Sequence, residues 1–283
     1  MKKLNLILLG SLLSISMVSC GQNRSNYNSP KGYDLNHPIK YNMPADLLEI
    51  SGIAFNNGDA NTIYAEQDED GKLFYFKPGD KNIRHTKFAK HGDYEDVAVI
   101  NNYVVLMRSD ATFFTFPLNG IKNKDADNVQ EFKKILPDGE YEGMHAYGGK
   151  LYILCKIGTG VDHNKLCNGY ILTIDAEGKL EKSGNFLIAV KNIAAKLGEK
   201  KMKFHPSALA KNPLTSQWYI LSSVNKIIVT TDNNWNVQQV YPIDPKIFLQ
   251  PEGMAFDRQG NLYISNEGSK TQPGNILFFK HHP

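Results

Sequence analysis

Ser51-Gly-Ile-Ala-Phe55 is the first of five related segments that decide the fold of this chain. The others are Glu95-Asp-Val-Ala-Val99, Glu142-Gly-Met-His-Ala146, Ser207-Ala-Leu-Ala-Lys211 and Glu252-Gly-Met-Ala-Phe256. Their first residues are separated by 44, 47, 65 and 45 positions. A repeat with a period in the mid-forties is typical of a β-propeller, in which each repeat forms one four-stranded blade.

Two further β-rich runs follow each segment, separated by turn residues such as Asp70-Gly71 and Gly148-Gly149. The first of these runs are Thr62-Ile-Tyr-Ala65, Tyr103-Val-Val-Leu-Met107, Lys150-Leu-Tyr-Ile-Leu154, Gln217-Trp-Tyr-Ile-Leu221 and Asn261-Leu-Tyr-Ile-Ser265. The second are Lys72-Leu-Phe-Tyr-Phe76, Thr112-Phe-Phe-Thr-Phe116, Tyr170-Ile-Leu-Thr-Ile174, Lys226-Ile-Ile-Val-Thr230 and Asn275-Ile-Leu-Phe-Phe279. Such hairpins in series predict an all-β protein.

The ends of the chain favour five blades. The last repeat stops soon after its third strand, and the extended segment Ile39–Met43 can supply the missing fourth strand and close the ring. Only the 65-residue interval is long, and within it 190–203 has the spacing of an amphipathic helix inserted at a blade edge. Six blades are the alternative, with the extra blade inside that interval. We expect one propeller domain over 37–283.

The composition excludes several classes of protein. The chain has 283 residues, of which 41% are apolar and 22% charged. This is enough to bury a substantial core, and it argues against disorder, collagen and a multi-pass membrane protein. The formal charge is +3, from 32 Lys and Arg against 29 Asp and Glu, without clustering. We therefore expect no nucleic-acid binding.

The first residues resemble the signal peptide of a bacterial lipoprotein. Lys2-Lys3 precede an apolar run from Leu4 to Val18, which is short for a membrane span, and the run ends at Cys20 followed by glycine. We expect cleavage after residue 19 and lipidation of Cys20, which would anchor the protein to a membrane of the bacterial cell envelope, with the outer membrane as the expected location. The alternative is an ordinary secretory signal peptide in which Cys20 is incidental. Either signal places the domain outside the cytoplasm.

The polar segment 20–36 predicts a flexible tether between the anchor and the propeller. Without residues 1–19 the chain has 264 residues, and 30 basic residues against 29 acidic ones leave a charge of +1. We expect this mature protein to be a monomer. Export also permits a disulfide between Cys155 and Cys167, whose geometry the sequence does not define.

The first residue of each repeat is expected at one mouth of the central channel, because the innermost strands line it. These five residues, named here the ring residues, are Ser51, Glu95, Glu142, Ser207 and Glu252. Three carboxylates brought together repel one another, and a cation would relieve the repulsion. Oxygen ligands alone favour Ca²⁺ over Zn²⁺. The alternative is a hydrogen-bonded column of water with the glutamates capping backbone N–H groups.

Five segments carry a resemblance to a known family: Leu48-Glu-Ile-Ser-Gly-Ile-Ala-Phe55, Tyr94-Glu-Asp-Val-Ala98, Tyr141-Glu-Gly-Met144, His205-Pro-Ser-Ala-Leu209 and Gln250-Pro-Glu-Gly-Met-Ala-Phe256. They resemble the SdiA-regulated family of exported bacterial β-propellers, from about Ile39 to the end of the chain. This resemblance implies an exported propeller and no defined biochemical activity.

A more remote resemblance concerns the ring residues. Their order Ser, Glu, Glu, Ser, Glu is similar to that of the calcium-activated nucleotidase (apyrase) family, five-bladed propellers that hold Ca²⁺ with one residue per blade. The resemblance implies a central Ca²⁺ site. It does not carry over nucleotide hydrolysis, which depends on further residues that have no clear match in this chain.

Loops after the second strand of each blade should open beside the ring residues. They supply weak catalytic candidates, Asp68, Arg108, Lys156 and Glu267. In a hydrolase, Arg108 and Lys156 would bind an anionic substrate while a carboxylate oriented water near the metal. The competing interpretation is structural: Arg108 would pair with Asp110 or Asp96, and Lys156 would be a solvent-facing strand end.

Two classes of function remain. We favour a binding propeller in which Ca²⁺ is structural and the channel mouth or a blade edge engages a small anionic ligand, a glycan or a protein. The alternative is a Ca²⁺-dependent hydrolase of a small anionic ester, lactone or phosphoanhydride. Because a propeller does not by itself imply a reaction, the residues around the ring must decide.

Overall fold

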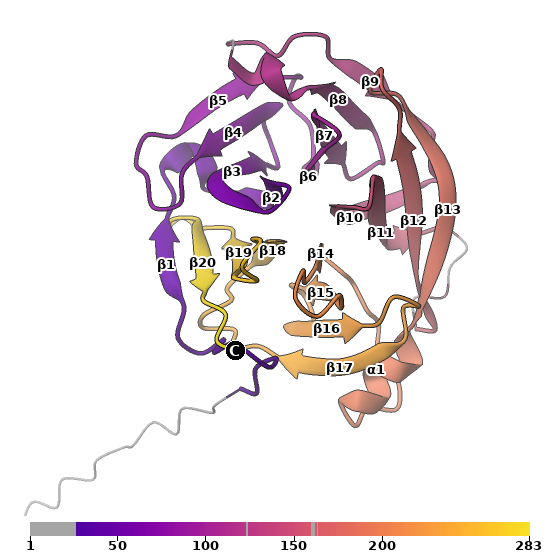
Figure 1. Cartoon of the computed structure of the whole chain (residues 1–283). Helices are drawn as coiled ribbons and strands as arrows, with labels where there is room; N and C mark the ends of the chain where they lie inside the picture. Colours follow the sequence, from indigo (N-terminus) through magenta and orange to yellow (C-terminus); the bar gives the residue numbers. More distant parts are fainter. Residues whose placement is uncertain (1–26, 123, 160–161, 163) are drawn as a thin grey trace, which may run out of the picture.

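The chain forms five antiparallel sheets of four strands around a central channel (Figure 1). The structure is a computed structural model, and it describes residues 27–122, 124–159, 162 and 164–283. The prediction of a five-bladed all-β propeller is confirmed. The six-bladed alternative is wrong, because the described residues of the 65-residue interval between the third and fourth repeats contain a helix and a loop after blade 3 and no additional sheet.

Each of the first four blades uses consecutive strands, ordered from the channel outward. Blade 1 comprises β2 (Ile50–Asn56), β3 (Asp59–Gln67), β4 (Lys72–Phe76) and β5 (Arg84–Lys87). Blade 2 comprises β6 (Tyr94–Ile100), β7 (Tyr103–Arg108), β8 (Phe113–Pro117) and β9 (Gln130–Phe132). Blade 3 comprises β10 (Gly139–Tyr147), β11 (Lys150–Gly158), β12 (Leu166–Ile174) and β13 (Leu180–Ala189). Blade 4 comprises β14 (Ala208–Lys211), β15 (Trp218–Ser222), β16 (Ile227–Thr231) and β17 (Val237–Pro242).

Blade 5 closes the ring with strands from both ends of the chain. It comprises β18 (Pro251–Phe256), β19 (Leu262–Asn266), β20 (Asn275–Phe279) and, as the outermost strand, β1 (Ile39–Asn42). β1 runs antiparallel to β20, with Ile39 opposite Phe278. This confirms the closure expected from the sequence, and it leaves β20 without a free edge.

The propeller begins earlier than the sequence predicted. Tyr33 and Leu35, within the predicted tether 20–36, are buried in the core cluster between blades 4 and 5. The Tyr33 hydroxyl donates a hydrogen bond to the Gly260 carbonyl at 2.6 Å. Tyr33 and Leu35 therefore belong to the propeller, because their side chains are buried in its core. The predicted signal peptide and Cys20 lie outside the described residues.

Only one α-helix occurs in the described part of the chain, α1 (Val190–Lys196), together with two short 3₁₀ turns, η1 (Ala45–Leu47) and η2 (Leu118–Lys122). The helix is shorter than the predicted 190–203, since Gly198 adopts a left-handed backbone conformation that ends it. Val190, Ile193 and Ala194 anchor it against blades 3 and 4. No helix of the described chain is long and apolar enough to cross a membrane.

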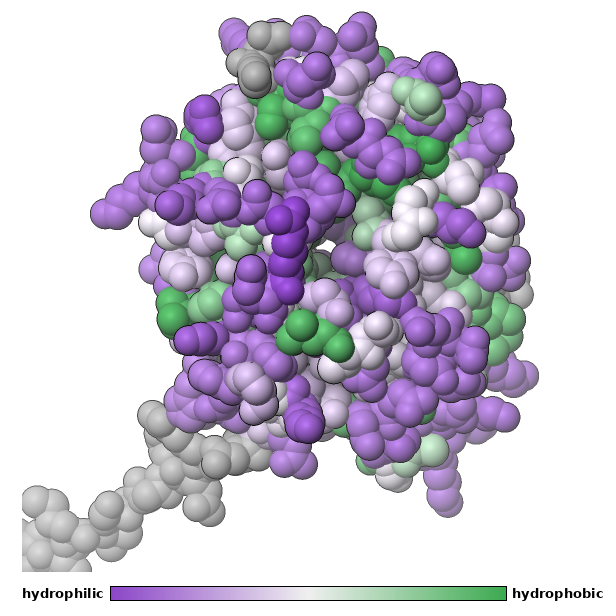
Figure 2. All heavy atoms as spheres, viewed as in Figure 1, coloured by the Kyte–Doolittle hydropathy of each residue, from purple (hydrophilic) through white to green (hydrophobic). Residues whose placement is uncertain are grey.

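The core lies between adjacent blades rather than at the channel. Strands such as β15, β16 and β19 are buried at every position, because a neighbouring blade covers each face. The outermost strand β13 is instead buried only at Leu180, Phe186 and Ile188. The face shown in Figure 2 is mostly hydrophilic, with a narrow opening near its centre.

Candidate functional site at the channel mouth

The ring residues lie at irregularities in the innermost strands. The pairing register shifts between Ile50 and Ile53 in β2, and between Tyr94 and Asp96 in β6. Corresponding shifts occur at Glu142 in β10 and Glu252 in β18, and Ser207 directly precedes β14. β-bulges re-aim the side chain that they carry and are common beside functional sites. All five blades thus present the first residue of the repeat at the same end of the channel.

Small residues after the ring residues let the inner strands approach one another closely. A Cβ at Gly52 would lie only 2.6 Å from the Asp96 Cα of the next blade, and one at Gly143 would lie 3.0 Å from the Ala208 carbonyl carbon. Neither position has room for a larger side chain. The glycines of the repeat therefore set the diameter of the channel and bring the ring residues together.

The three ring glutamates, Glu95, Glu142 and Glu252, interact electrostatically across the channel mouth. Burial, and then the neighbouring Glu142 carboxyl, raise the pKa of Glu95 to about 10. Burial raises the pKa of Glu142 to about 7, and Glu252 contributes to that rise. The pKa of Glu252 is also raised by burial. Three carboxyls from three blades therefore share one poorly solvated space.

The two ring serines are turned toward the backbone of the adjacent blade. The Ser51 hydroxyl donates to the Glu95 carbonyl at 3.2 Å, and the Ser207 hydroxyl donates to the Pro251 carbonyl at 3.1 Å. Each serine thereby ties its own blade to the backbone next to a ring glutamate. These hydroxyls stabilise the ring as well as offering oxygen atoms to it.

Lys156 is the counter-ion of the ring. Its ammonium group contacts the Glu142 carboxylate, and it also interacts with Glu95 and Glu252. Burial lowers the pKa of Lys156, but the attraction of the three ring glutamates together, Glu142 foremost, outweighs that effect and the net pKa is raised. The chain itself thus supplies one positive charge to the ring glutamates. Lys156 is neither a free strand end nor an anion ligand in this structure.

An acidic rim surrounds the ring, and it contains two of the predicted catalytic residues. Burial, followed by the charge of Glu252, raises the pKa of Glu267 to about 8. Burial and the nearby Glu49 raise that of Asp68 to about 6. Of the basic residues, Lys226 interacts with Glu252 while its ammonium group donates to the Leu249 carbonyl at 2.6 Å. The mouth is therefore an acidic environment.

Arg108 forms an ion pair with Asp110 rather than with a ring residue. Its guanidinium forms a two-pronged interaction with the Asp110 carboxylate, with one N–H···O distance of 3.2 Å. This confirms the structural alternative that the sequence offered. With Lys156 bound to Glu142, both predicted anion ligands already have carboxylate partners.

Two buried carboxyls beside the ring, Asp96 and Glu66, lie outside the set of site residues predicted from the sequence. Asp96 accepts hydrogen bonds from Val97 N at 2.8 Å and Met144 N at 2.6 Å, and so connects blades 2 and 3. Glu66 accepts from Gly52 N at 2.6 Å, and its other oxygen has no partner in the described chain. Burial raises the pKa of both carboxyls well above the usual range. The signal for Asp96 was its occurrence where the other repeats have Gly or Ala.

The candidate disulfide is not formed, and both cysteines are free thiols. Cys155 packs in the core between blades 2 and 3, whereas Cys167 packs between blades 3 and 4. The register of β11 with β12 places Leu154 opposite Gly169, so the two cysteines point to opposite faces of one sheet. Burial raises the pKa of the Cys155 thiol to about 11, which keeps it protonated.

The chemistry of the ring suits a hard cation, but its carboxylates are not assembled around a common point. Carboxylate and hydroxyl oxygens are ligands that Ca²⁺ accepts. However, in the described chain no group of three His, Cys, Asp or Glu side chains is spaced to hold a metal ion.

Comparisons with known proteins show the fold. No protein-family model matches the sequence, and no curated protein sequence matches it. The glutaminyl cyclase of Myxococcus xanthus is similar in structure, with a TM-score of 0.55 at 13% identity over 87% of this chain and 97% of that one. The PQQ-bound aldose sugar dehydrogenase of Streptomyces coelicolor gives 0.56 at 10% identity over 90% of this chain and 100% of that one. A luciferin-regenerating enzyme gives 0.52 at 11% identity, covering 87% and 96%.

These structures are β-propellers. At such low identities the similarity supports the architecture alone. Function must be argued from the residues at the channel mouth.

Proposed function

We propose that this protein is a non-catalytic binding propeller whose ring glutamates hold a divalent cation, Ca²⁺, at the mouth of the channel. The observation that carries the proposal is that three carboxyls from three blades interact in one poorly solvated space, where burial raises the pKa of each. Lys156 provides one positive charge for Glu95, Glu142 and Glu252 together. A bound cation would stabilise the ionised forms of these carboxyls.

The charge of the rim supports a cation rather than an anionic substrate. Asp68 and Glu49 add negative charge around the ring at neutral pH, which raises the local concentration of cations and repels phosphates and carboxylates. Arg108 and Lys156, the groups a hydrolase would need for an anion, are paired with carboxylates. The hydrolase alternative therefore gains no support from the site.

The ring residues are the groups that would hold the ion. Glu95, Glu142 and Glu252 offer carboxylate oxygens, and Ser51 and Ser207 lie beside them with hydroxyl oxygens. A bound Ca²⁺ would supply positive charge and link blades through shared ligands. For Glu142 to join, the Lys156 ammonium must leave its carboxylate. We propose that the Lys156 ammonium group competes with Ca²⁺ for the Glu142 carboxylate. When no Ca²⁺ is bound, this ion pair stabilises the ring residues.

The cellular setting is proposed from the sequence. The first residues resemble a lipoprotein signal peptide, and lipidation of Cys20 would anchor the protein in the bacterial envelope. The resemblance to the SdiA-regulated propellers agrees with export. With Ca²⁺ bound, the channel mouth would be able to engage a small anionic ligand or a protein group that the acidic rim otherwise repels. We propose a monomer and no nucleic-acid partner.

Calorimetric titration of the chelator-treated mature protein with Ca²⁺ tests this function. We expect saturable binding and a rise in Tm, both abolished in the variant with Glu95→Gln, Glu142→Gln and Glu252→Gln together. Glu181→Gln on the exposed face of blade 3 is the control and should bind Ca²⁺ like the wild type. Absence of a Tm change in the wild type, at Ca²⁺ concentrations up to the millimolar range of extracellular sites, would refute the proposal.

A further inference from the structure

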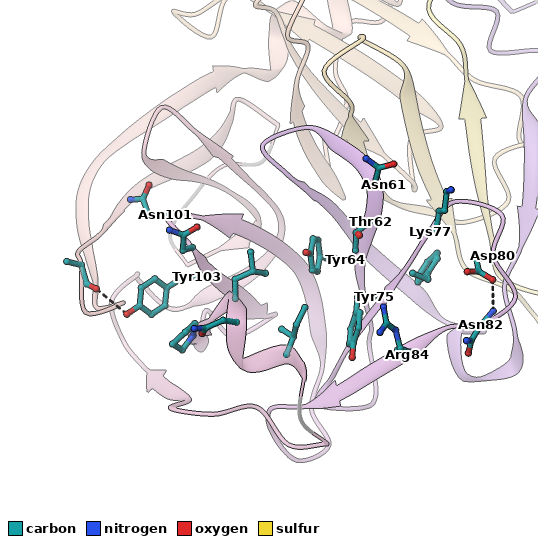
Figure 3. Close-up of a pocket in the computed structure, with 17 residues that line it drawn as sticks. Asn61, Thr62, Tyr64, Tyr75, Lys77, Asp80, Asn82, Arg84, Asn101 and Tyr103 are labelled. Atoms are coloured by element: carbon teal, nitrogen blue, oxygen red, sulfur yellow. Dashed lines mark hydrogen bonds between the residues drawn. The ribbon is translucent and has the colours of Figure 1, made fainter.

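A polar cavity, here named the outer groove, lies between blades 1 and 2 (Figure 3), and none of the ring residues lines it. Its volume is about 990 Å³, which is at the upper end of the range for small-ligand pockets. The Asn101–Asn102 turn joins β6 to β7 at the end of blade 2 opposite Glu95, so the groove opens away from the acidic mouth.

A row of amphipathic side chains from blade 1 forms one wall of the groove. Tyr64 in β3 is directly opposite Tyr75 in β4, which in turn is opposite Arg84 in β5. Paired residues in an antiparallel sheet lie on the same face, so the three side chains line up across the blade. The Arg84 guanidinium lies 4.9 Å from the centre of the Tyr75 ring. Both tyrosines are less than 10% exposed, so their rings are fixed in place.

Side-chain amides form the opposite wall. Asn101 and Asn102 are the two central residues of the hairpin between Ile100 and Tyr103, and both have positive φ angles, 49° and 64°. Such a two-residue turn has a defined backbone geometry, and both side chains are solvent-exposed and line the groove. Neither amide has a hydrogen-bond partner among the described residues, and the same is true of the Tyr64 and Tyr75 hydroxyls. The groove thus presents unused donors and acceptors on both walls.

These groups match the chemistry of a carbohydrate. Each amide offers a donor and an acceptor side by side, which suits neighbouring hydroxyl groups, and tyrosine combines an apolar ring with a polar tip. The charged residues of the lining, Lys77, Asp80 and Arg84, leave only one excess positive charge. A phosphorylated ligand would require a denser set of cations. We propose that the outer groove binds a neutral oligosaccharide.

Saturation-transfer NMR with the mature protein tests this site. The probes are oligomers of N-acetylglucosamine, of glucose and of mannose, with a polyanionic heparin fragment and an unrelated peptide mixture for comparison. All measurements include EDTA, because binding in the groove must not depend on a cation at the ring. Failure of Ca²⁺ binding would therefore leave this proposal intact, and failure here would leave the ring unaffected.

Asn101→Gly combined with Asn102→Gly removes both amides and keeps a turn that glycine adopts readily. We expect saturable binding of at least one neutral oligomer by the wild type, and at least a tenfold weaker Kd for this double variant. Asn57→Gly is the matched control, because Asn57 also has a φ of 49° in a hairpin but lies outside the groove. It should bind within twofold of the wild type.

Tyr75→Phe removes one hydroxyl with little change of packing and should weaken binding by a smaller factor. Three outcomes would overturn the proposal: no neutral oligomer binds, the double variant binds as tightly as the Asn57→Gly control, or the heparin fragment or peptides bind while neutral oligomers do not. The last would assign the groove to a different class of partner.

Discussion

Replacing Lys156 by methionine removes the only ammonium group that contacts the ring glutamate Glu142 among the described residues. The Lys156 side chain is 26% exposed and that of Glu142 is 11% exposed, so the pair is largely shielded from water. At a contact separation of about 3 Å and an effective dielectric constant of about 20, the attraction is roughly 5 kcal/mol. Part of this is offset by the cost of desolvating both groups.

Breaking a largely buried ion pair from one side leaves the other charge without a partner. We therefore expect Lys156→Met to lower the free energy of unfolding by about 2–3 kcal/mol at pH 8 without Ca²⁺. At pH 5 the loss should be smaller, because Glu142, with a pKa of about 7, then holds a proton. Urea unfolding at both pH values in EDTA measures the difference.

Adding Ca²⁺ to Lys156→Met distinguishes the loss of the ion pair with Glu142 from a loss of side-chain packing. If Lys156 competes with the cation, Lys156→Met should bind Ca²⁺ more tightly than the wild type and regain the lost stability. Lys179→Met is the control, since Lys179 forms an exposed pair with Glu181 and should leave the free energy of unfolding close to that of the wild type. A variant as stable as the wild type at pH 8, or one whose Ca²⁺ affinity falls, would refute the reasoning.

Three further predictions follow from the same structure. Gly52→Ala should destabilise the protein by at least about 2 kcal/mol in urea unfolding, because its Cβ would lie 2.6 Å from the Asp96 Cα; unchanged unfolding would contradict the close approach of blades 1 and 2. Burial raises the carboxyl pKa of Glu142 to about 7 and that of Glu267 to about 8, so the folded protein binds these protons more tightly than the unfolded chain. This stabilisation is complete below about pH 4.5 and lost as the pH rises through 7 and 8, so Tm in EDTA should fall between pH 5 and pH 8; a rising Tm would argue against it. A reductant should leave Tm unchanged, because Cys155 and Cys167 are free thiols, whereas a drop would indicate a disulfide.

The internal repeat was sufficient to predict the position of many site residues. The first residue of each segment could be assigned to one end of the channel because equivalent positions in equivalent blades occupy equivalent places. Asp68 and Glu267 were placed near that end for the same reason, since they follow the second strands of their blades. What the repeat did not show was the partner of each charged group. Lys156 and Glu142 are 14 positions apart, and they meet only because a bulge in β10 turns Glu142 toward the end of β11.

The sequence alone predicted the strand order within each blade, favoured five blades over six and assigned the closing strand to Ile39–Met43, because the period and the hairpin pattern are local properties of the chain. Tertiary structure alone decided that Cys155 and Cys167 lie on opposite faces of one sheet, and that the walls of the outer groove meet between blades 1 and 2. These features depend on the register of paired strands and on the packing of one blade against the next. A shift of the strand register by one residue moves each side chain to the other face of the sheet. A repeat period of about forty-five residues does not define the register to a single residue.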